Sequence, residues 1–181
     1  MKAISALVAA VGLAAPLLAQ TPASSPEQCL HIRTSINFTV NAPYEVTAPL
    51  FGPLGERPWV GKIWDPVFVH PQPANDIEGA VFTVYREPNT EVWINTLFDV
   101  AQRHFQYVYF RPGLAVTLVD VRFEPIGVDA TRVDVVFTRA AITLAGNERV
   151  KAMSEIDKNA APVWQQKIAA YLASVKPQTQ H

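Results

Sequence analysis

The sequence predicts an α+β fold in which a curved antiparallel sheet packs one face against a long C-terminal helix. Two observations support this prediction. Alternating polar and apolar residues recur between residues 80 and 143 with only short turns between the runs, and apolar residues then recur at helical spacing between residues 148 and 173. Period-two alternation is typical of half-buried strands, and three-and-four spacing is typical of an amphipathic helix. Connections of a few residues join antiparallel neighbours, so the strands should form a meander.

The first nineteen residues match a secretory signal peptide. Lys2 is the only charged residue, an apolar run extends from Ala6 to Ala19, and a polar segment begins at Gln20. This order is typical of an export signal, and the run is shorter than the roughly 20 apolar residues of a membrane-spanning helix. We expect cleavage after Ala19 and an exported protein, periplasmic or secreted, with no stable membrane span after cleavage. An uncleaved anchor is the alternative.

The mature chain is expected to be one domain. Residues 20–31 are rich in Pro, Ser, Thr and Ala, a composition that buries little and predicts a flexible leader. Residues 32–175 should form the domain, and residues 176–181 a short tail. The net charge is −1, from 15 Lys and Arg against 16 Asp and Glu. This balance offers no basic patch for nucleic acid and no polybasic segment for an anionic membrane.

The single cysteine, Cys29, lies in the predicted leader. One cysteine cannot form an internal disulfide. The residues before it, Pro26-Glu27-Gln28, are unlike the small apolar residues that precede the modified cysteine of a lipoprotein. The hydrophobic core must therefore stabilise the fold, and a mature chain of this length can bury one.

The first half of the domain combines one strand with an irregular segment. Residues 34–40 alternate with Ile36, Phe38 and Val40 on one side, and Pro43 is well placed to open a short helix to about residue 50. Between residues 51 and 75 the chain carries eight glycines and prolines, which exclude a long regular element. The large apolar residues of that segment should fill a core or surround a pocket.

The second half reads as five strands and a helix. The strands are expected at residues 80–86, 91–101, 104–111, 114–124 and 130–143. In the fourth of them Val119, Val121 and Phe123 share one face, and in the fifth Val133, Val135 and Phe137 do so, while charged residues take the opposite face. One apolar face needs a cover, which the helix at residues 148–173 supplies, with Pro162 expected to kink or restart it.

Several local motifs resemble those of the START-like (SRPBCC) superfamily, which includes lipid-transfer domains and polyketide cyclase or dehydrase-like proteins. The resemblance covers residues 32–173, and its motifs are degenerate and mostly structural. The matching segments are Phe38-Thr39-Val40-Asn41-Ala42-Pro43, Glu56-Arg57-Pro58-Trp59, Trp64-Asp65-Pro66, Gly79-Ala80-Val81-Phe82, Tyr107-Val108-Tyr109-Phe110-Arg111-Pro112-Gly113, Ala130-Thr131-Arg132-Val133 and residues 163–172. The resemblance implies a helix-grip fold, with about seven antiparallel strands wrapped around the C-terminal helix.

The same resemblance implies a cavity between the sheet and the helix, commonly holding a hydrophobic, lipid-like small molecule, in a superfamily where catalysis is the minority behaviour. It supplies no universal catalytic motif and no cofactor, and fold alone does not establish an activity. The candidate cavity residues are Trp64, Phe68, Phe82, Trp93, Tyr107, Tyr109, Arg111, Phe123, Phe137 and Trp164. Each aromatic taken alone is more simply a core residue.

Asp99 and His104 could act as a general acid and base if both faced the cavity. Alternation argues against this role, because Val92, Ile94 and Phe98 form the apolar side of their strand and send Asp99 to the other side, together with Asn95. A β-bulge would reverse the assignment. We interpret Asp99 as a solvated or salt-bridged residue and His104 as a turn residue.

Arg111 is the strongest polar candidate. It ends a strand that also carries Tyr107 and Tyr109, and a guanidinium beside two phenols suits a carboxylate or another polar head group. The alternative is a sheet-edge arginine paired with a carboxylate of the protein. The sequence leaves both interpretations open.

The sequence favours binding over catalysis. The four histidines show no close ligand pair, and no nucleophile or phosphate-loop motif occurs. We expect no metal and no cofactor, because an exported domain also lacks routine access to nucleotides and carrier-bound intermediates. The leading hypothesis is an exported domain that binds or carries a hydrophobic small molecule. The alternatives are a cofactor-independent cyclase or dehydrase-like enzyme, and an interaction module with a filled core and an exposed apolar patch.

Overall fold

The computed structural model describes residues 28–175, so the predicted signal peptide, most of the leader and the tail lie outside the described residues. Short helices follow the first strand, a strand meander forms the middle, and two helices end the chain. The elements are β1 (His31–Val40), α1 (Tyr44–Thr47), η1 (Ala48–Phe51), α2 (Arg57–Val60), β2 (Val67–His70), β3 (Val81–Arg86), β4 (Asn89–Asp99), β5 (His104–Arg111), β6 (Ala115–Ile126), β7 (Ala130–Ala141), α3 (Gly146–Lys158) and α4 (Ala160–Val175).

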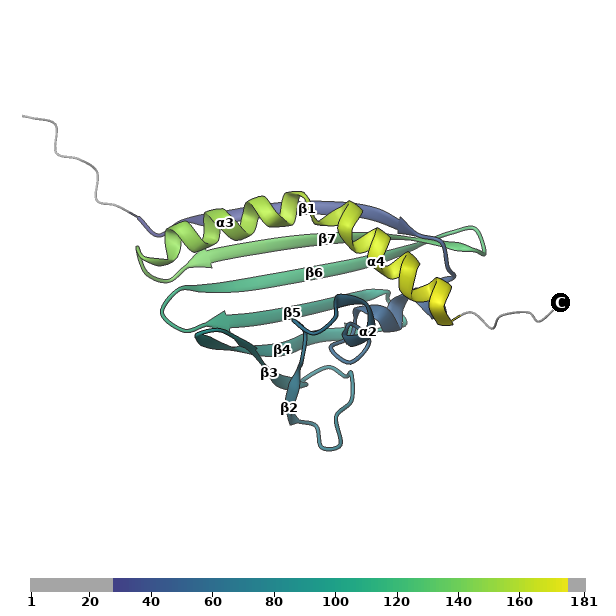
Figure 1. Cartoon of the computed structure of the whole chain (residues 1–181), viewed down its shortest axis with the longest axis horizontal. Helices are drawn as coiled ribbons and strands as arrows, with labels where there is room; N and C mark the ends of the chain where they lie inside the picture. The colour runs from purple at the N-terminus through teal and green to yellow at the C-terminus, as the bar shows by residue number, and fades with distance from the viewer. Residues whose placement is uncertain (1–27, 176–181) are drawn as a thin grey trace, which may run out of the picture.

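The strands form one seven-stranded antiparallel sheet in the order β1-β7-β6-β5-β4-β3-β2. Consecutive strands from β2 to β7 are neighbours, and β1 joins the free edge of β7. Helix α3 packs along β1 and β7, whereas α4 crosses the same face of the sheet and contacts α2 (Figure 1). The predicted α+β class, with a curved antiparallel sheet around C-terminal helices, is confirmed.

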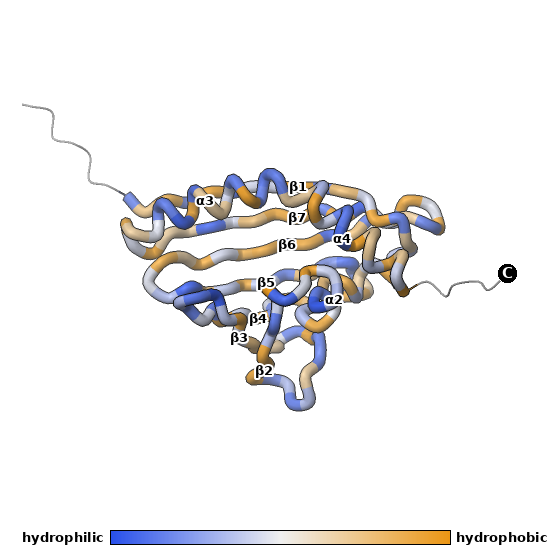
Figure 2. The backbone as a smooth tube through the Cα atoms, in the orientation of Figure 1, coloured by the Kyte–Doolittle hydropathy of each residue, from blue (hydrophilic) through white to orange (hydrophobic). Residues whose placement is uncertain are grey.

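The faces of β6 follow the predicted alternation. Val119, Val121 and Phe123 are buried on the face toward the helices, whereas Asp120 and Arg122 lie on the other side. Apolar residues run along the middle strands of the sheet, while α3 is largely hydrophilic along its length (Figure 2). The sheet therefore buries its inner face, and each fully buried large side chain on it contributes roughly 1.5–3 kcal/mol.

The prediction for the first half of β4 is wrong. Val92 and Ile94 are 37% and 38% exposed on the outer face. The inner face carries Trp93 and the fully buried Asn95 instead. In this half of β4 the outer face is apolar and the inner face is partly polar. The prediction assumed that apolar residues point inward, and it therefore assigned each side chain to the wrong face.

A β-bulge then reverses the faces within the same strand. The pairing of β4 with β5 shifts between Asn95 and Leu97, and beyond the shift Phe98 points inward and stacks on Phe105 with ring centroids 4.0 Å apart. An inserted residue changes which face each following side chain occupies. The second half of β4 therefore agrees with the predicted faces although the first half does not.

The strand boundaries differ from the prediction mainly at the start of the domain. β1 begins at His31 instead of residue 34, and the backbone N–H of Leu30 donates to Asn147 Oδ1 at 2.8 Å. The four-residue strand β2 was not predicted, because it lies between Pro66 and Pro71 within the irregular segment. A short edge strand of this kind limits pairing with other chains.

The C-terminal helix is two helices, and the break comes at Asn159 and not at Pro162. Pro162 is the third residue of α4. The first four N–H groups of a helix have no intrahelical partner, so proline is tolerated there. Pro162 therefore lies in the first turn of α4 and does not cause the break before it. None of the helices in the described part of the chain is long and apolar enough to cross a membrane.

Candidate functional site

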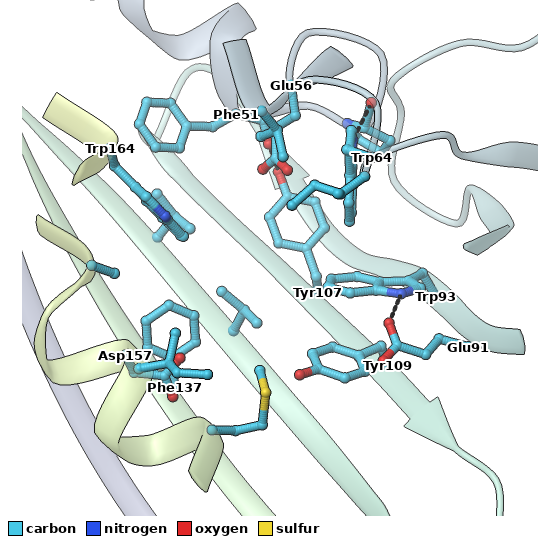
Figure 3. Close-up of a pocket in the computed structure, with 18 of the residues that line it drawn as sticks. Phe51, Glu56, Trp64, Glu91, Trp93, Tyr107, Tyr109, Phe137, Asp157 and Trp164 are labelled. Carbon is cyan, nitrogen blue, oxygen red and sulfur yellow. Dashed lines mark hydrogen bonds between the residues drawn. The ribbon is translucent and has the colours of Figure 1, made fainter. Parts of the chain in front are cut away.

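A cavity of about 270 Å³ lies between the inner face of the sheet and the helices α2, α3 and α4. An apolar cavity of roughly 150 Å³ is enough to bind benzene. The space is therefore suited to a compact molecule of one or two rings. Figure 3 shows the side chains that surround it, from the strands on one side and from the helices and the α2 loop on the other.

Aromatic side chains make up much of the wall. Trp93 and Tyr109 stack with ring centroids 4.0 Å apart on neighbouring strands. On the helical side Trp164 meets the ring of Phe137 edge-on at 6.0 Å and that of Trp59 at 5.8 Å. Offset and edge-on pairs of this kind add roughly 0.5–1.5 kcal/mol each beyond their buried area. They hold the wall in a fixed shape around the open space.

Seven of the ten residues that the sequence singled out line this cavity. They are Trp64, Phe82, Trp93, Tyr107, Tyr109, Phe137 and Trp164. The other three lie behind the wall. Phe68 stacks on Phe82 at 5.4 Å, Phe123 packs between other rings of the core, and Arg111 lines a small void next to the cavity.

Arg111 is 7% exposed and pairs with a carboxylate of the protein. Its Nε lies 3.4 Å from Glu91 Oε1, and the other oxygen of Glu91 accepts a hydrogen bond from Trp93 Nε1 at 3.2 Å. A void of about 10 Å³, close to the size of one water, separates Arg111 from Tyr109 and Arg149. The sequence left two interpretations of Arg111 open, and the structure agrees with the second, an arginine paired with a carboxylate of the protein.

Arg139 and Asp157 form a buried ion pair at one end of the cavity. Arg139 Nε and Nη2 donate to the two carboxylate oxygens at 2.7 and 2.8 Å, and Nη1 donates to Thr117 Oγ1 at 2.9 Å and to the hydroxyl of Tyr109. Burial lowers the pKa of Arg139, but the hydrogen bonds and charge of Asp157, together with Tyr109, outweigh burial and leave this pKa raised. The pair is thus a fixed part of the wall.

Arg149 on α3 lines the same end of the cavity. Burial lowers its pKa, and the charge of Arg111 lowers it further, while Tyr109 and Glu91 act in the opposite direction. Within residues 28–175 its guanidinium has no hydrogen-bond partner and no carboxylate within 4.0 Å, and its Nε is buried. Arg149 is therefore a cation that no carboxylate in this part of the chain contacts directly, although Glu91 offsets part of its charge from a distance.

The loop before α2 places a carboxyl group at the opposite end. Asp76 accepts hydrogen bonds from the backbone N–H of Leu54 at 3.0 Å and of Gly55 at 3.4 Å, and Glu56 N donates to Gly52 O at 2.9 Å. A side chain at Gly52 would meet Asp76 Oδ2 at 2.1 Å, so the close approach of this loop requires glycine. The loop is fixed by its backbone and carries Glu56 to the cavity.

Glu56 and Tyr107 point toward one another across this end of the cavity (Figure 3). Burial raises the pKa of Glu56 well above its ordinary value, the charge of Asp76 raises it further, and Arg86 lowers it. Tyr107 donates to the backbone carbonyl of Phe51, and burial with the nearby carboxylates raises its pKa well above the ordinary value. Both shifts favour the neutral, proton-bearing forms of Glu56 and Tyr107 relative to the same groups in water.

Asp99 and His104 do not meet in the cavity. His104 Nε2 lies 2.7 Å from Asp120 Oδ2 on the outer face of the sheet. Asp99 accepts a hydrogen bond from the backbone N–H of Gln102 at 2.8 Å in the turn after β4. Asp99 has the surface role that the alternation favoured. His104 was interpreted as a turn residue and is instead the first residue of β5, paired with Asp120. Within residues 28–175 no group of three or more histidine, cysteine or acidic side chains is placed to hold a metal ion.

Sequence reasoning missed most of the polar cavity residues. Arg139 shares the parity of Phe137 on β7, so a charged residue on the apolar face was a usable signal. Arg149 and Asp157 are eight residues apart, about two helical turns, and hence on one face of α3. Nothing local marked Glu56, because its place depends on a loop closed by distant contacts.

Comparison of sequences finds no matching family model and no matching curated protein, whereas the fold resembles many solved structures. A structure of norcoclaurine synthase from Thalictrum flavum in complex with dopamine and hydroxybenzaldehyde has a TM-score of 0.60 at 10% identity, over 83% of this chain and 91% of that one. The Zhui aromatase/cyclase from a Streptomyces species has a TM-score of 0.59 at 13% identity, over 84% of this chain and 100% of that one. The Mll3558 protein from Rhizobium loti has a TM-score of 0.56 at 18% identity, over 80% of this chain and 99% of that one.

These likenesses, at identities below one fifth, concern the fold. The chain has the helix-grip fold that the sequence motifs implied, a fold that it shares with the norcoclaurine synthase and the aromatase/cyclase. The fold supports many functions, so the function of this chain must be argued from its own cavity.

Proposed function

We propose that this chain is an exported protein that binds a small hydrophobic molecule in the cavity between the sheet and the C-terminal helices. The observation that supports the proposal most directly is the aromatic cavity of about 270 Å³. Ligand sites are typically concave and largely apolar, with a few polar groups that fix orientation. The cavity also counts against an interaction module with a filled core.

The size and lining of the cavity favour a ring-bearing ligand over a long acyl chain. Stacked Trp93 and Tyr109 on one side and Trp164 on the other offer flat apolar surfaces. The norcoclaurine synthase of similar fold was crystallised with dopamine and hydroxybenzaldehyde, both one-ring compounds. We therefore narrow the expected hydrophobic ligand from lipid-like to compact and aromatic.

Export rests on the sequence alone. The single charge of Lys2, the apolar run to Ala19 and the polar residues after it match a signal peptide. Expression of the full chain in a bacterium, followed by cell fractionation and N-terminal sequencing, tests this part separately. A mature protein outside the cytoplasm that begins at Gln20 supports export, and an uncleaved cytoplasmic chain contradicts it.

Binding is tested with a neutral aromatic probe and a variant that fills the cavity. Val119 lines the cavity from β6, so Val119→Phe places a ring in the open space. Val116→Phe adds the same ring to the outer face of the same strand and is the matched control. Calorimetric titration with cinnamamide should detect binding to the wild type and to Val116→Phe, with at least tenfold weaker binding to Val119→Phe. Equal affinities for all three would contradict the cavity as the binding site.

A second candidate function is cofactor-free catalysis with Glu56 as general acid. The observation that favours it is a cavity-facing carboxyl group whose pKa burial raises well above its ordinary value, opposite Tyr107. A general acid works best when its pKa lies near the working pH. The test is ring closure between dopamine and hydroxybenzaldehyde, followed by mass spectrometry. Product that forms with the wild type but not with Glu56→Gln supports catalysis, and equal yields from both contradict it.

A further inference from the structure

The charged side chains around the cavity are unevenly balanced. Its lining includes four cationic residues, Arg86, Arg139, Arg149 and Lys167, against three acidic ones, Glu56, Glu91 and Asp157. The surplus is one positive charge if Glu56 is ionised and two if it keeps its proton. The whole chain, in contrast, has a net charge of −1. Positive charge is thus concentrated where a ligand would bind.

Most of these cations already have partners within the protein. Arg139 has both oxygens of Asp157, Lys167 Nζ donates to the carbonyl of Val60 at 3.2 Å, and Arg86 donates to the carbonyl of Ile63. These groups are held to the wall by contacts that need no ligand. The remaining cation of the lining is Arg149.

Two guanidinium groups at or beside the cavity lack full partners. Arg111 Nε and Arg149 Nε are buried with no hydrogen-bond partner within residues 28–175. Arg111 shares Glu91, whereas Arg149 has no carboxylate within 4.0 Å in the same part of the chain. A buried polar group without a partner costs roughly 1–3 kcal/mol, and more when it is charged. Such a group calls for a partner from outside the protein, and a bound ligand is one such partner.

The position of Arg149 links the charge to the cavity. Five residues line both the main cavity and the small void beside Arg111, namely Glu91, Tyr109, Arg139, Arg149 and Met153. A head group bound at Arg149 would therefore leave the rest of the molecule in the aromatic part of the cavity. The lowered pKa of Arg149, caused first by burial and then by Arg111, is the electrostatic sign of the same missing counter-charge.

We infer that the ligand is a small aromatic carboxylic acid whose carboxylate binds Arg149 while its ring lies against the aromatic wall. This inference rests on the proposed binding function and names its ligand class. A carboxylate accepts two parallel hydrogen bonds from a guanidinium, so it matches both the charge and the donors that Arg149 offers. A single negative charge also fits the surplus of one or two.

The test compares two probes of the same shape and different charge. Cinnamic acid and cinnamamide are titrated calorimetrically at about pH 7.5, where a carboxylic acid is ionised. We expect the acid to bind at least tenfold more tightly than the amide. Arg149→Met should bring the ratio of acid affinity to amide affinity close to one, and Arg149→Lys should keep part of the preference for the acid. Arg122→Met, on the outer face of β6, should change neither affinity.

Each outcome separates the inference from the proposed function. If both probes bind equally to the wild type, or if Arg149→Met keeps the preference for the acid, the carboxylate inference is wrong while the cavity function stands. If neither probe binds, the binding function fails and the inference fails with it. Far-ultraviolet circular dichroism and thermal melting verify that each variant is folded, and Arg149→Lys provides the readout if Arg149→Met does not fold.

Discussion

Asp157 on α3 and Arg139 on β7 join the helical layer to the sheet through two parallel hydrogen bonds of 2.7 and 2.8 Å. Both side chains are almost fully buried. The pair therefore positions the C-terminal end of α3 relative to the strands, and it does so with charged groups that would be costly to separate.

Asp157→Asn should destabilise the fold by about 3–5 kcal/mol, because it leaves the buried guanidinium of Arg139 without its counter-charge. Urea unfolding measures the loss. Asp134→Asn, which breaks the half-exposed pair with Arg132, is the control and should cost about 1 kcal/mol or less. A loss below that of the control would mean that the pair does not stabilise the folded state.

Glu56→Gln should change the pH dependence of stability. Because burial raises the pKa of Glu56 in the folded state, the folded chain holds the proton more tightly than the unfolded chain. Below its ordinary value of 4.5 both states are protonated and Glu56 carries no penalty. As the pH rises above that value the wild type should lose stability relative to Glu56→Gln, until the folded pKa is passed.

Urea unfolding of the wild type and Glu56→Gln at several pH values measures this difference. Glu155→Gln, an exposed residue paired with Lys158, provides the baseline and should show almost no pH-dependent difference from the wild type. A difference for Glu56→Gln that stays flat, or that shrinks as the pH rises, would contradict a raised pKa in the folded state.

Gly55→Ala should displace the loop that carries Glu56. A Cβ atom at this position would lie 1.7 Å from the carbonyl oxygen of Pro49, a contact that backbone must move to relieve. We expect a loss of stability of about 2 kcal/mol or more, together with weaker probe binding. Gly113→Ala, which meets open space and only a positive φ of 70°, should cost about 1–2 kcal/mol and leave binding intact.

Tyr107→Phe should destabilise the fold by about 1–3 kcal/mol, because the carbonyl of Phe51 loses its buried donor. The same substitution at Tyr85, whose side chain is exposed on β3, should cost almost nothing. Thermal melting of the two variants gives the comparison. Equal melting temperatures would show that a water molecule replaces the hydroxyl of Tyr107.

The sequence predicted the long regular strands well because their alternation is uninterrupted. In β6, Val119 and Val121 alternate with Asp120 and Arg122, and burial in the structure follows that pattern. The resemblance to START-like proteins added the expected number of about seven strands and the cavity between the sheet and the C-terminal helix, neither of which alternation can supply.

The strand β4 could not be predicted by the same reasoning, because it lines the cavity. Its inner face holds Glu91 and Asn95 as well as Trp93, and its outer face holds Val92 and Ile94. A strand that provides polar groups to a binding site breaks the rule that apolar residues point inward. The bulge after Asn95 is likewise set by tertiary pairing and has no local sequence signal.

The candidate site was predictable in its aromatic part only. Trp93, Tyr109 and Trp164 stood out by residue type and lie at the cavity. Arg149 and Glu56 became recognisable only after folding had brought α3 and the α2 loop to the same space. The role of Arg149 depends on the partners that it lacks, and the role of Glu56 depends on Tyr107 opposite it. Such relationships arise from the folded structure and have no signal in the sequence.

The break at Asn159 divides the helical wall into two panels of different character. Helix α3 presents the charged panel with Arg149 and Asp157, and α4 presents the apolar panel with Val163 and Trp164. The two helices are separate backbone elements. We therefore expect that substitutions on α3 and on α4 change the preference for a ligand's head group and for its ring independently. One substitution on each helix should change the binding free energy additively, and a double-mutant cycle measures any departure. Two helices with separate backbones thus allow the charged and the apolar part of the cavity to be redesigned one at a time.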